Sequence, residues 1–281
     1  MALVKVDFFS ASLMRTVTIN AVVPVDKMVM PGQEVREKKP FKTLYLLHGI
    51  FGNYTDWVTG TNIHAWAQEK NLVVIMPSGD NKFYVDSDAT GERYGEFIGK
   101  ELVQVTRDLF HLSDKREDTY IAGLSMGGYG AIINGLKYNE VFGCIAGLSS
   151  GFILDTILTS TNDGPLPTMK RSYFEVLFGN LDQLIGSDKD YKALLLSLKE
   201  KQAVMPMIYL ACGTEDFLIA QNRDYRDFLT EHDVQVTYEE GPGGHEWNFW
   251  NTYIKKVLDW LPLETGAEGI HSGNVGIRKD N

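Results

Sequence analysis

Cysteine is scarce in this sequence, with only two residues among 281. Cys144 and Cys212 both lie in apolar runs that are typical of core strands, so we expect two buried free thiols. Neither a disulfide nor a metal site is expected from two cysteines in such surroundings.

Runs of basic residues are absent, and 37 acidic residues outnumber 27 Lys and Arg residues. The resulting formal net charge of -10 at pH 7 argues against nucleic acid or an anionic membrane as a partner, because both would repel the protein. Long apolar runs are also missing, since none approaches the roughly 18 residues that span a bilayer. Residues 1–7 lack the charged and apolar regions of a signal peptide. These features together predict a cytoplasmic protein.

The most informative segment is the pentapeptide Gly123-Leu124-Ser125-Met126-Gly127. This G-x-S-x-G pattern follows an apolar run typical of a strand and precedes a run typical of a helix. In α/β-hydrolases such a segment forms the nucleophile elbow, a sharp turn that presents the serine hydroxyl at the end of a strand. The alternative is an ordinary glycine-rich turn without chemistry. If the elbow is real, an acid and a histidine should follow the serine in that order.

Strands and helices alternate along most of the chain. From residue 41 onward this alternation predicts an α/β fold with a mainly parallel sheet covered by helices on both faces. Sites in such sheets lie at the carboxyl ends of the strands. The residues expected at these ends are His48, Ser125, Ser149, Ser150 and Gly213. Strands are expected at 4–9, 16–23, 44–47, 72–76, 119–125, 144–148, 207–212 and 234–238, and helices at 97–110, 173–178, 191–200, 222–229 and 247–261, with another following the elbow.

The alternation is interrupted at residues 151–200. We expect a single domain over residues 1–263, in which 151–200 forms a small cap over the active site and 264–281 a loose tail. An ordinary long crossover connection is the alternative for the segment 151–200.

Two later segments supply the acid and the base. Asp216 follows a buried strand, where a carboxylate can orient a histidine and stabilise its protonated form. Glu215 is the rival for this role. His245 lies in the glycine-rich segment 241–247, which allows its ring to reach a serine on another strand. The order Ser125, Asp216, His245 is that of the α/β-hydrolases.

The turn at His48-Gly49-Ile50-Phe51-Gly52 is expected to complete the site. A backbone N–H there, together with that of Met126, would bind the oxyanion of a tetrahedral intermediate. Ile50 is the preferred first donor and Phe51 the alternative, while the His48 side chain is expected to hold the loop. Adjacency to these motifs suggests three substrate-binding side chains, namely those of Phe51, Trp57 and Phe152.

These motifs resemble the esterase D group of α/β-hydrolases over residues 4–262, and most closely the tributyrin esterases of Gram-positive bacteria. The resemblance implies an α/β-hydrolase fold and a serine carboxylesterase that cleaves short-chain acyl esters, or aryl esters, through an acyl-enzyme. It implies the catalytic residues Ser125, Asp216 and His245, a small-molecule ester substrate, no cofactor and no metal, and a possible homo-oligomer, either dimer or tetramer.

Other activities stay open at this point. A feruloyl, cinnamoyl or acetyl esterase acting on plant-derived esters is one, and an S-formylglutathione hydrolase-like thioesterase or an acyltransferase is another. S-formylglutathione hydrolases usually carry a histidine where this chain has Tyr129, and their oxyanion loop differs. A catalytically inactive binding protein of the same fold is the alternative from a different class.

Overall fold

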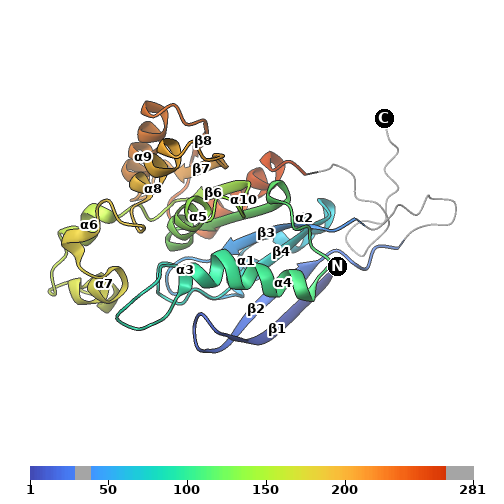
Figure 1. Ribbon diagram of the computed structural model, residues 1–281. Helices are drawn as coiled ribbons and strands as arrows, with labels where there is room; N and C mark the ends of the chain where they lie inside the picture. Colours follow the sequence, from blue (N-terminus) through green and yellow to red (C-terminus); the bar gives the residue numbers. More distant parts are fainter. Residues whose placement is uncertain (29–38, 264–281) are drawn as a thin grey trace.

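The computed structural model describes residues 1–28 and 39–263 of the chain. Its centre is an eight-stranded sheet with the order β1-β2-β4-β3-β5-β6-β7-β8 (Figure 1). The strands are β1 (Ala2–Ser10), β2 (Arg15–Val23), β3 (Lys42–Leu47), β4 (Leu72–Pro77), β5 (Thr119–Leu124), β6 (Cys144–Leu148), β7 (Met207–Gly213) and β8 (Val236–Gly241).

Six of these strands run parallel, and the hairpin β1–β2 adds two antiparallel strands at one edge. Strands β4 and β5 consist entirely of buried residues, as expected for parallel strands enclosed on both faces. Because β3, β5, β6 and β7 run in the same direction, their carboxyl ends lie at the same end of the sheet. The loops that follow these strands are therefore neighbours.

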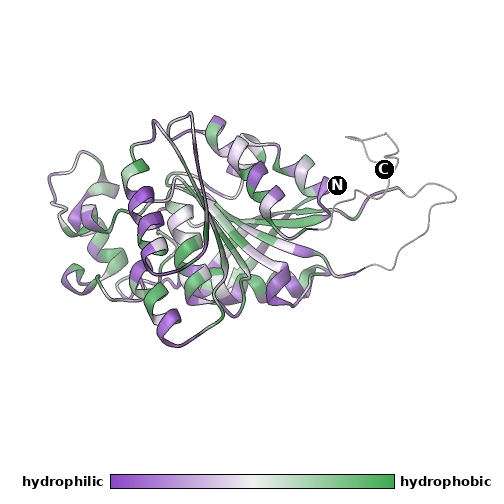
Figure 2. Ribbon diagram, turned by 90° about the horizontal axis from the view of Figure 1, so that it is seen from above, coloured by the Kyte–Doolittle hydropathy of each residue, from purple (hydrophilic) through white to green (hydrophobic). Residues whose placement is uncertain are grey.

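Helices cover both faces of the sheet, and apolar strand residues lie between them (Figure 2). Alternate strand residues pack against α4, α5, α8 and α9 on one face and against α1, α2 and α10 on the other. The helices are α1 (Asp56–Gly60), α2 (Ile63–Glu69), α3 (Tyr94–Glu96), α4 (Leu102–Leu109), α5 (Met126–Lys137), α6 (Leu154–Leu158), α7 (Arg171–Phe178), α8 (Tyr191–Glu200), α9 (Ile219–Glu231) and α10 (Trp247–Trp260).

The expected α/β fold is confirmed, with differences at some element boundaries. The helix predicted at 97–110 starts three residues earlier, at α3, and its first five residues, Phe97–Glu101, form a π-helical turn before α4. The last strand begins two residues later than predicted, because the Val234 amide still bonds to the Leu229 carbonyl at the end of α9. The short helices α1, α2 and α6 were not predicted, since five to seven residues carry too little periodicity to reveal a helix.

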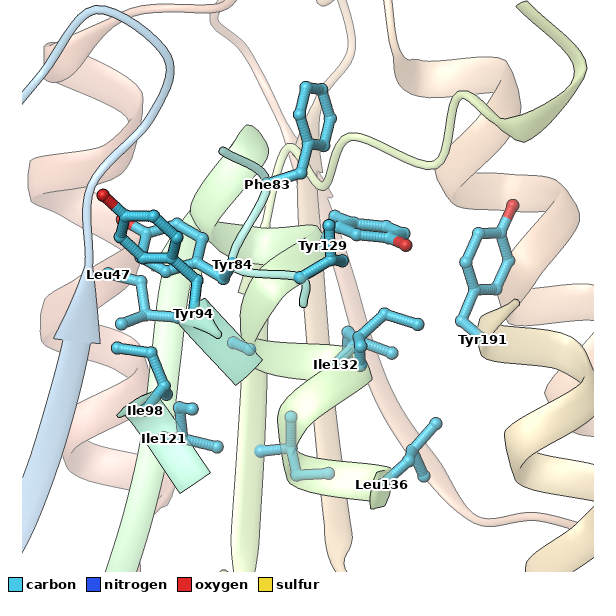
Figure 3. Close-up of a cluster of buried hydrophobic side chains, with 14 of the residues drawn as sticks. Leu47, Phe83, Tyr84, Tyr94, Ile98, Ile121, Tyr129, Ile132, Leu136 and Tyr191 are labelled. Atoms are coloured by element: carbon cyan, nitrogen blue, oxygen red, sulfur yellow. The ribbon is translucent and has the colours of Figure 1, made fainter. Parts of the chain in front are cut away.

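Residues 151–200 contain α6, α7 and α8, and the first two lie beyond one end of the sheet (Figure 1). The segment is anchored through an aromatic cluster in which Phe83, Tyr129 and Tyr191 gather beside α5 (Figure 3). The Tyr129 hydroxyl also donates to the Lys189 carbonyl at 2.6 Å. Tyr129 therefore has a structural role here. The tail predicted at 264–281 lies outside the described residues.

Both cysteines are free and buried, as predicted. Burial raises the pKa of each thiol to about 12, so neither is a nucleophile at neutral pH. Within residues 1–28 and 39–263, none of the helices combines the length and apolar character needed to cross a bilayer.

Candidate active site

Ser125 stands on a strained turn between β5 and α5. Its φ of 54° lies in a region that side chains rarely adopt, and residues with such backbone strain cluster at functional sites. The turn needs glycine on both sides: a Cβ at position 123 would lie 2.2 Å from the Gly127 carbonyl oxygen, and one at 127 would lie 2.5 Å from the His48 oxygen. The local sequence therefore forms the sharp elbow that the pentapeptide predicts.

His245 reaches this serine from the loop between β8 and α10. Its Nε2 lies 2.9 Å from Ser125 Oγ, and its Nδ1 lies 2.9 Å from Asp216 Oδ2. A carboxylate only accepts hydrogen bonds, so Nδ1 carries the proton and Nε2 is free to accept the serine proton. The Trp250 ring stands edge-on to the imidazole, with the centroids 4.9 Å apart, and limits its movement.

Asp216 is held on the loop after β7, and its side chain is fully buried. Its second oxygen, Oδ1, accepts the Leu218 amide at 2.8 Å. Burial alone would raise the pKa of this carboxyl, but the hydrogen bonds from His245 and Leu218 outweigh it and lower the pKa. The carboxylate is consequently ionised at neutral pH and oriented toward the imidazole.

Glu215, the rival acid, occupies a different place. Its carboxylate is solvent-exposed and accepts the Gly243 amide at 2.6 Å and the Thr214 hydroxyl at 2.9 Å. In return the Glu215 amide donates to the Gly243 carbonyl. Glu215 thus fastens the histidine loop to the acid loop, whereas Asp216 is the carboxylate that contacts His245.

The turn after β3 runs beside the elbow. A Cβ on Gly49 would lie 3.4 Å from Ser125 Cβ, which places the following Ile50 next to the serine. In the part of the chain that the structure describes, the amides of Ile50 and Met126 donate to no acceptor. Both are therefore available to an oxyanion. The Phe51 amide is not, because it donates to Asn81 Oδ1 at 2.8 Å.

His48 holds this turn, as expected. Its Nε2 accepts the Gly79 amide at 2.8 Å, and its Nδ1 lies 2.6 Å from the Gly49 oxygen. Burial lowers the pKa of this imidazole, so it is neutral and bridges the loops after β3 and β4.

Two of the three side chains expected to bind substrate are buried in this structure. Trp57 is 1% exposed and Phe152 is 3% exposed. The Trp57 indole donates to the Leu47 carbonyl and packs against Trp247, while Phe152 packs between Tyr191 and Tyr225. Only Phe51, at 66% exposure, presents its ring to solvent.

The sequence did not indicate the roles of Trp250 and Ser149, which support His245 and Asp216. The Trp250 indole N–H donates to Ser149 Oγ at 3.2 Å, and Ser149 itself is fully buried with a φ of 46°. The Ser149 hydroxyl in turn helps to lower the pKa of the Asp216 carboxyl. The position of Ser149 at the end of β6 was visible in the sequence, but its partners depend on how the loops fold.

An eight-stranded α/β sheet that presents a serine, a histidine and an aspartate in this arrangement is that of a serine hydrolase of the α/β-hydrolase type. Residues 10–261 match the family described as putative esterase, and the chain belongs to this family. The esterase resemblance seen in the motifs is therefore confirmed, and the chain is a serine esterase, a carboxylic ester hydrolase.

Among relatives, an acetyl esterase of Caldicellulosiruptor saccharolyticus is 45% identical over 261 residues, which cover 93% of this chain and 98% of that protein. A substrate-bound fluorophosphonate-binding serine hydrolase of Staphylococcus aureus is 30% identical, with a TM-score of 0.81 over 92% of this chain and 98% of that one. An S-formylglutathione hydrolase of the same organism is 31% identical, with a TM-score of 0.79 and the same coverage.

Proposed function

We propose that Ser125, His245 and Asp216 are the catalytic triad of this esterase, and that the enzyme hydrolyses short-chain acyl esters. The observation that carries the proposal is the pair of 2.9 Å contacts joining Ser125 Oγ to His245 and His245 to Asp216. Ser125 Oγ attacks the ester carbonyl carbon while His245 Nε2 takes its proton. The amides of Ile50 and Met126 bind the oxyanion that forms.

Collapse of this intermediate completes the first half of the reaction. His245 returns the proton to the leaving oxygen, the alcohol departs, and the acyl group stays on Ser125. Water then attacks the acyl-enzyme with His245 again as the base, and the acid is released. Asp216 keeps the imidazole in the required tautomer and stabilises its charged form.

A short acyl group is supported by one comparison. The 45% identical relative is an acetyl esterase. We propose acetyl and other short acyl esters as the substrates, with feruloyl and cinnamoyl esters as the second candidates.

A panel of p-nitrophenyl acetate, butyrate, octanoate and dodecanoate, with methyl ferulate added, measures the acyl site directly. We expect kcat/KM to fall at least about tenfold from butyrate to dodecanoate, because an acyl site that fits a short chain cannot take the extra methylenes without displacing packed neighbours. A rate that rises toward dodecanoate would contradict the short acyl site.

A competing alcohol in the same assay detects acyl transfer, and S-formylglutathione tests the thioesterase alternative. Absence of turnover on every ester would favour the inactive binding protein.

Asn81 is expected to be a positioning residue for the oxyanion loop. Its side chain accepts the Phe51 amide, and its carbonyl accepts the Tyr173 hydroxyl from α7. Asn81→Ala should lower kcat for p-nitrophenyl acetate by about tenfold with a smaller change in KM, because one oxyanion donor loses its alignment. Asn81→Asp keeps the acceptor and should restore most of kcat. An unchanged kcat in Asn81→Ala would show that Asn81 does not position the oxyanion loop.

The remaining proposals concern the domain and its setting. We propose that residues 1–263 form one domain with 151–200 as its cap, supported by the contacts of Tyr173 with Asn81 and of Ser87 with the Val176 carbonyl. We propose a cytoplasmic location because both cysteines are free thiols, which are typical of proteins in reducing compartments. A dimer or tetramer stays a prediction from the resemblance.

A further inference from the structure

Phe217 is a large apolar side chain that the fold leaves in solvent beside the catalytic base. It is 72% exposed, yet its ring lies against the His245 ring with the centroids 4.6 Å apart and the planes tilted by 46°. Its neighbours are fixed, since the Leu218 amide is bound to Asp216 and the Asp216 amide to the Gly213 carbonyl. Single exposed apolar residues are common on protein surfaces, but this ring differs from the others in its direct contact with the imidazole of His245.

The chemistry of ester cleavage tells which part of the substrate lies near Phe217. His245 Nε2 delivers a proton to the leaving oxygen, so the alcohol part of the ester must sit within hydrogen-bond reach of that nitrogen. Phe217 contacts the same imidazole and presents its outer face to solvent. It therefore borders the alcohol, whereas the Ile50 and Met126 amides border the carbonyl oxygen.

The charges around Phe217 restrict the alcohol further. Residues 213–218 and 241–248 carry two exposed carboxylates, those of Glu215 and Glu246, and contain no Lys or Arg. The nearest basic side chain along the chain, Arg223, is paired with Glu240. Hydrogen bonds from Gly243 and Thr214 lower the pKa of the Glu215 carboxyl and keep it ionised. An alcohol that carries a negative charge would be repelled here.

We infer that Phe217 is the platform of a subsite for the alcohol part of the ester, and that this subsite takes an uncharged alcohol bearing a ring with a flat apolar face. The inference rests on the proposed function of Ser125 and His245. An aromatic ring and the CH face of a pyranose both offer such a surface to a phenyl ring, so the shared chemistry is offset stacking of an apolar face on the Phe217 ring.

The test compares three esters that share the acetyl group and differ in the alcohol: phenyl acetate, a mono-acetylated methyl pyranoside and ethyl acetate. Phe217→Ala should lower kcat/KM for at least one of the two ring alcohols by about five- to tenfold, and by less than about twofold for ethyl acetate. Loss on the first ester alone identifies an aryl alcohol, and loss on the second identifies a sugar. Phe217→Trp should keep the wild-type preference.

The matched control is Phe9→Ala, which truncates a ring that is 62% exposed on the edge strand β1. It should leave all three values unchanged. For charge, 4-acetoxybenzoate should be a poorer substrate than phenyl acetate, although its carboxylate does not make the leaving group chemically worse.

Three results would overturn the subsite. Equal losses on all three esters in Phe217→Ala would show that the ring only positions His245, and no loss on any of them would show that it has no role. Equal rates on 4-acetoxybenzoate and phenyl acetate would remove the charge restriction. If the wild-type enzyme hydrolyses none of the esters, the proposed function itself fails. That result differs from an active enzyme in which Phe217→Ala leaves kcat/KM unchanged for the ring alcohols, which overturns only the subsite.

Discussion

Ser125→Ala is expected to lower kcat for p-nitrophenyl acetate by about 10⁶-fold, the scale seen when the nucleophile of a serine triad is removed. The loss is large because the acyl-enzyme cannot form without the hydroxyl, while the amides of Ile50 and Met126 remain. The fold should be unaffected, since alanine meets the same positive φ as serine at this turn. Far-UV circular dichroism and a urea unfolding curve check that point beside the kinetic assay.

Ser150→Ala is the matched control for this variant. Its hydroxyl is buried within the elbow region and has no hydrogen-bond partner among the described residues. We expect kcat to change by less than about threefold, because removal of a buried hydroxyl without a partner leaves no other group unsatisfied. Retained esterase activity in Ser125→Ala would mean that a different residue is the nucleophile.

Asp216→Asn is expected to lower kcat by about 10⁴-fold, less than the loss in Ser125→Ala, because triad members contribute unequally. An amide at this position can present its NH₂ group to His245 Nδ1 and favour the wrong tautomer. It also removes the negative charge that stabilises the protonated imidazole. The measurement is kcat for p-nitrophenyl acetate across neutral pH.

Glu215→Gln provides the comparison for the neighbouring acid. Glu215 is solvent-exposed and bonds to Gly243 and Thr214, so the glutamine oxygen can keep one of these hydrogen bonds. We expect a change in kcat of less than about tenfold. If Glu215→Gln were the damaging variant and Asp216→Asn the mild one, the acid of the triad would be Glu215.

The contacts among Ser125, His245 and Asp216 could be predicted from the sequence because these residues follow the ends of strands. Once the alternation of strands and helices indicates a parallel sheet, the loops after β5, β7 and β8 must lie at the same end of the sheet, where the strands finish. The glycines around Ser125 and His245 then show where the chain turns sharply. The order of residues and the composition of two loops are sufficient for this step.

Side chains that act through loop conformation could not be predicted in the same way. Asn81 and Ser149 depend on turns whose residues adopt positive φ without being glycine, among them Asp80 and Ser149 itself. No local pattern marks such turns. The burial of Trp57 and Phe152 could not be predicted for a related reason: an aromatic residue near a motif packs wherever the surrounding helices leave space, and the sequence does not reveal that space.

Labelling with a fluorophosphonate probe tests the central claim most directly. Ser125 Oγ would displace fluoride from phosphorus and form a stable phosphonyl ester, which intact-mass measurement and peptide mapping locate. We predict one adduct per chain on the peptide that contains Ser125, absent in Ser125→Ala and unchanged in Ser150→Ala. An adduct on another residue, or labelling and ester hydrolysis that persist in Ser125→Ala, would contradict the assignment of Ser125 as the nucleophile.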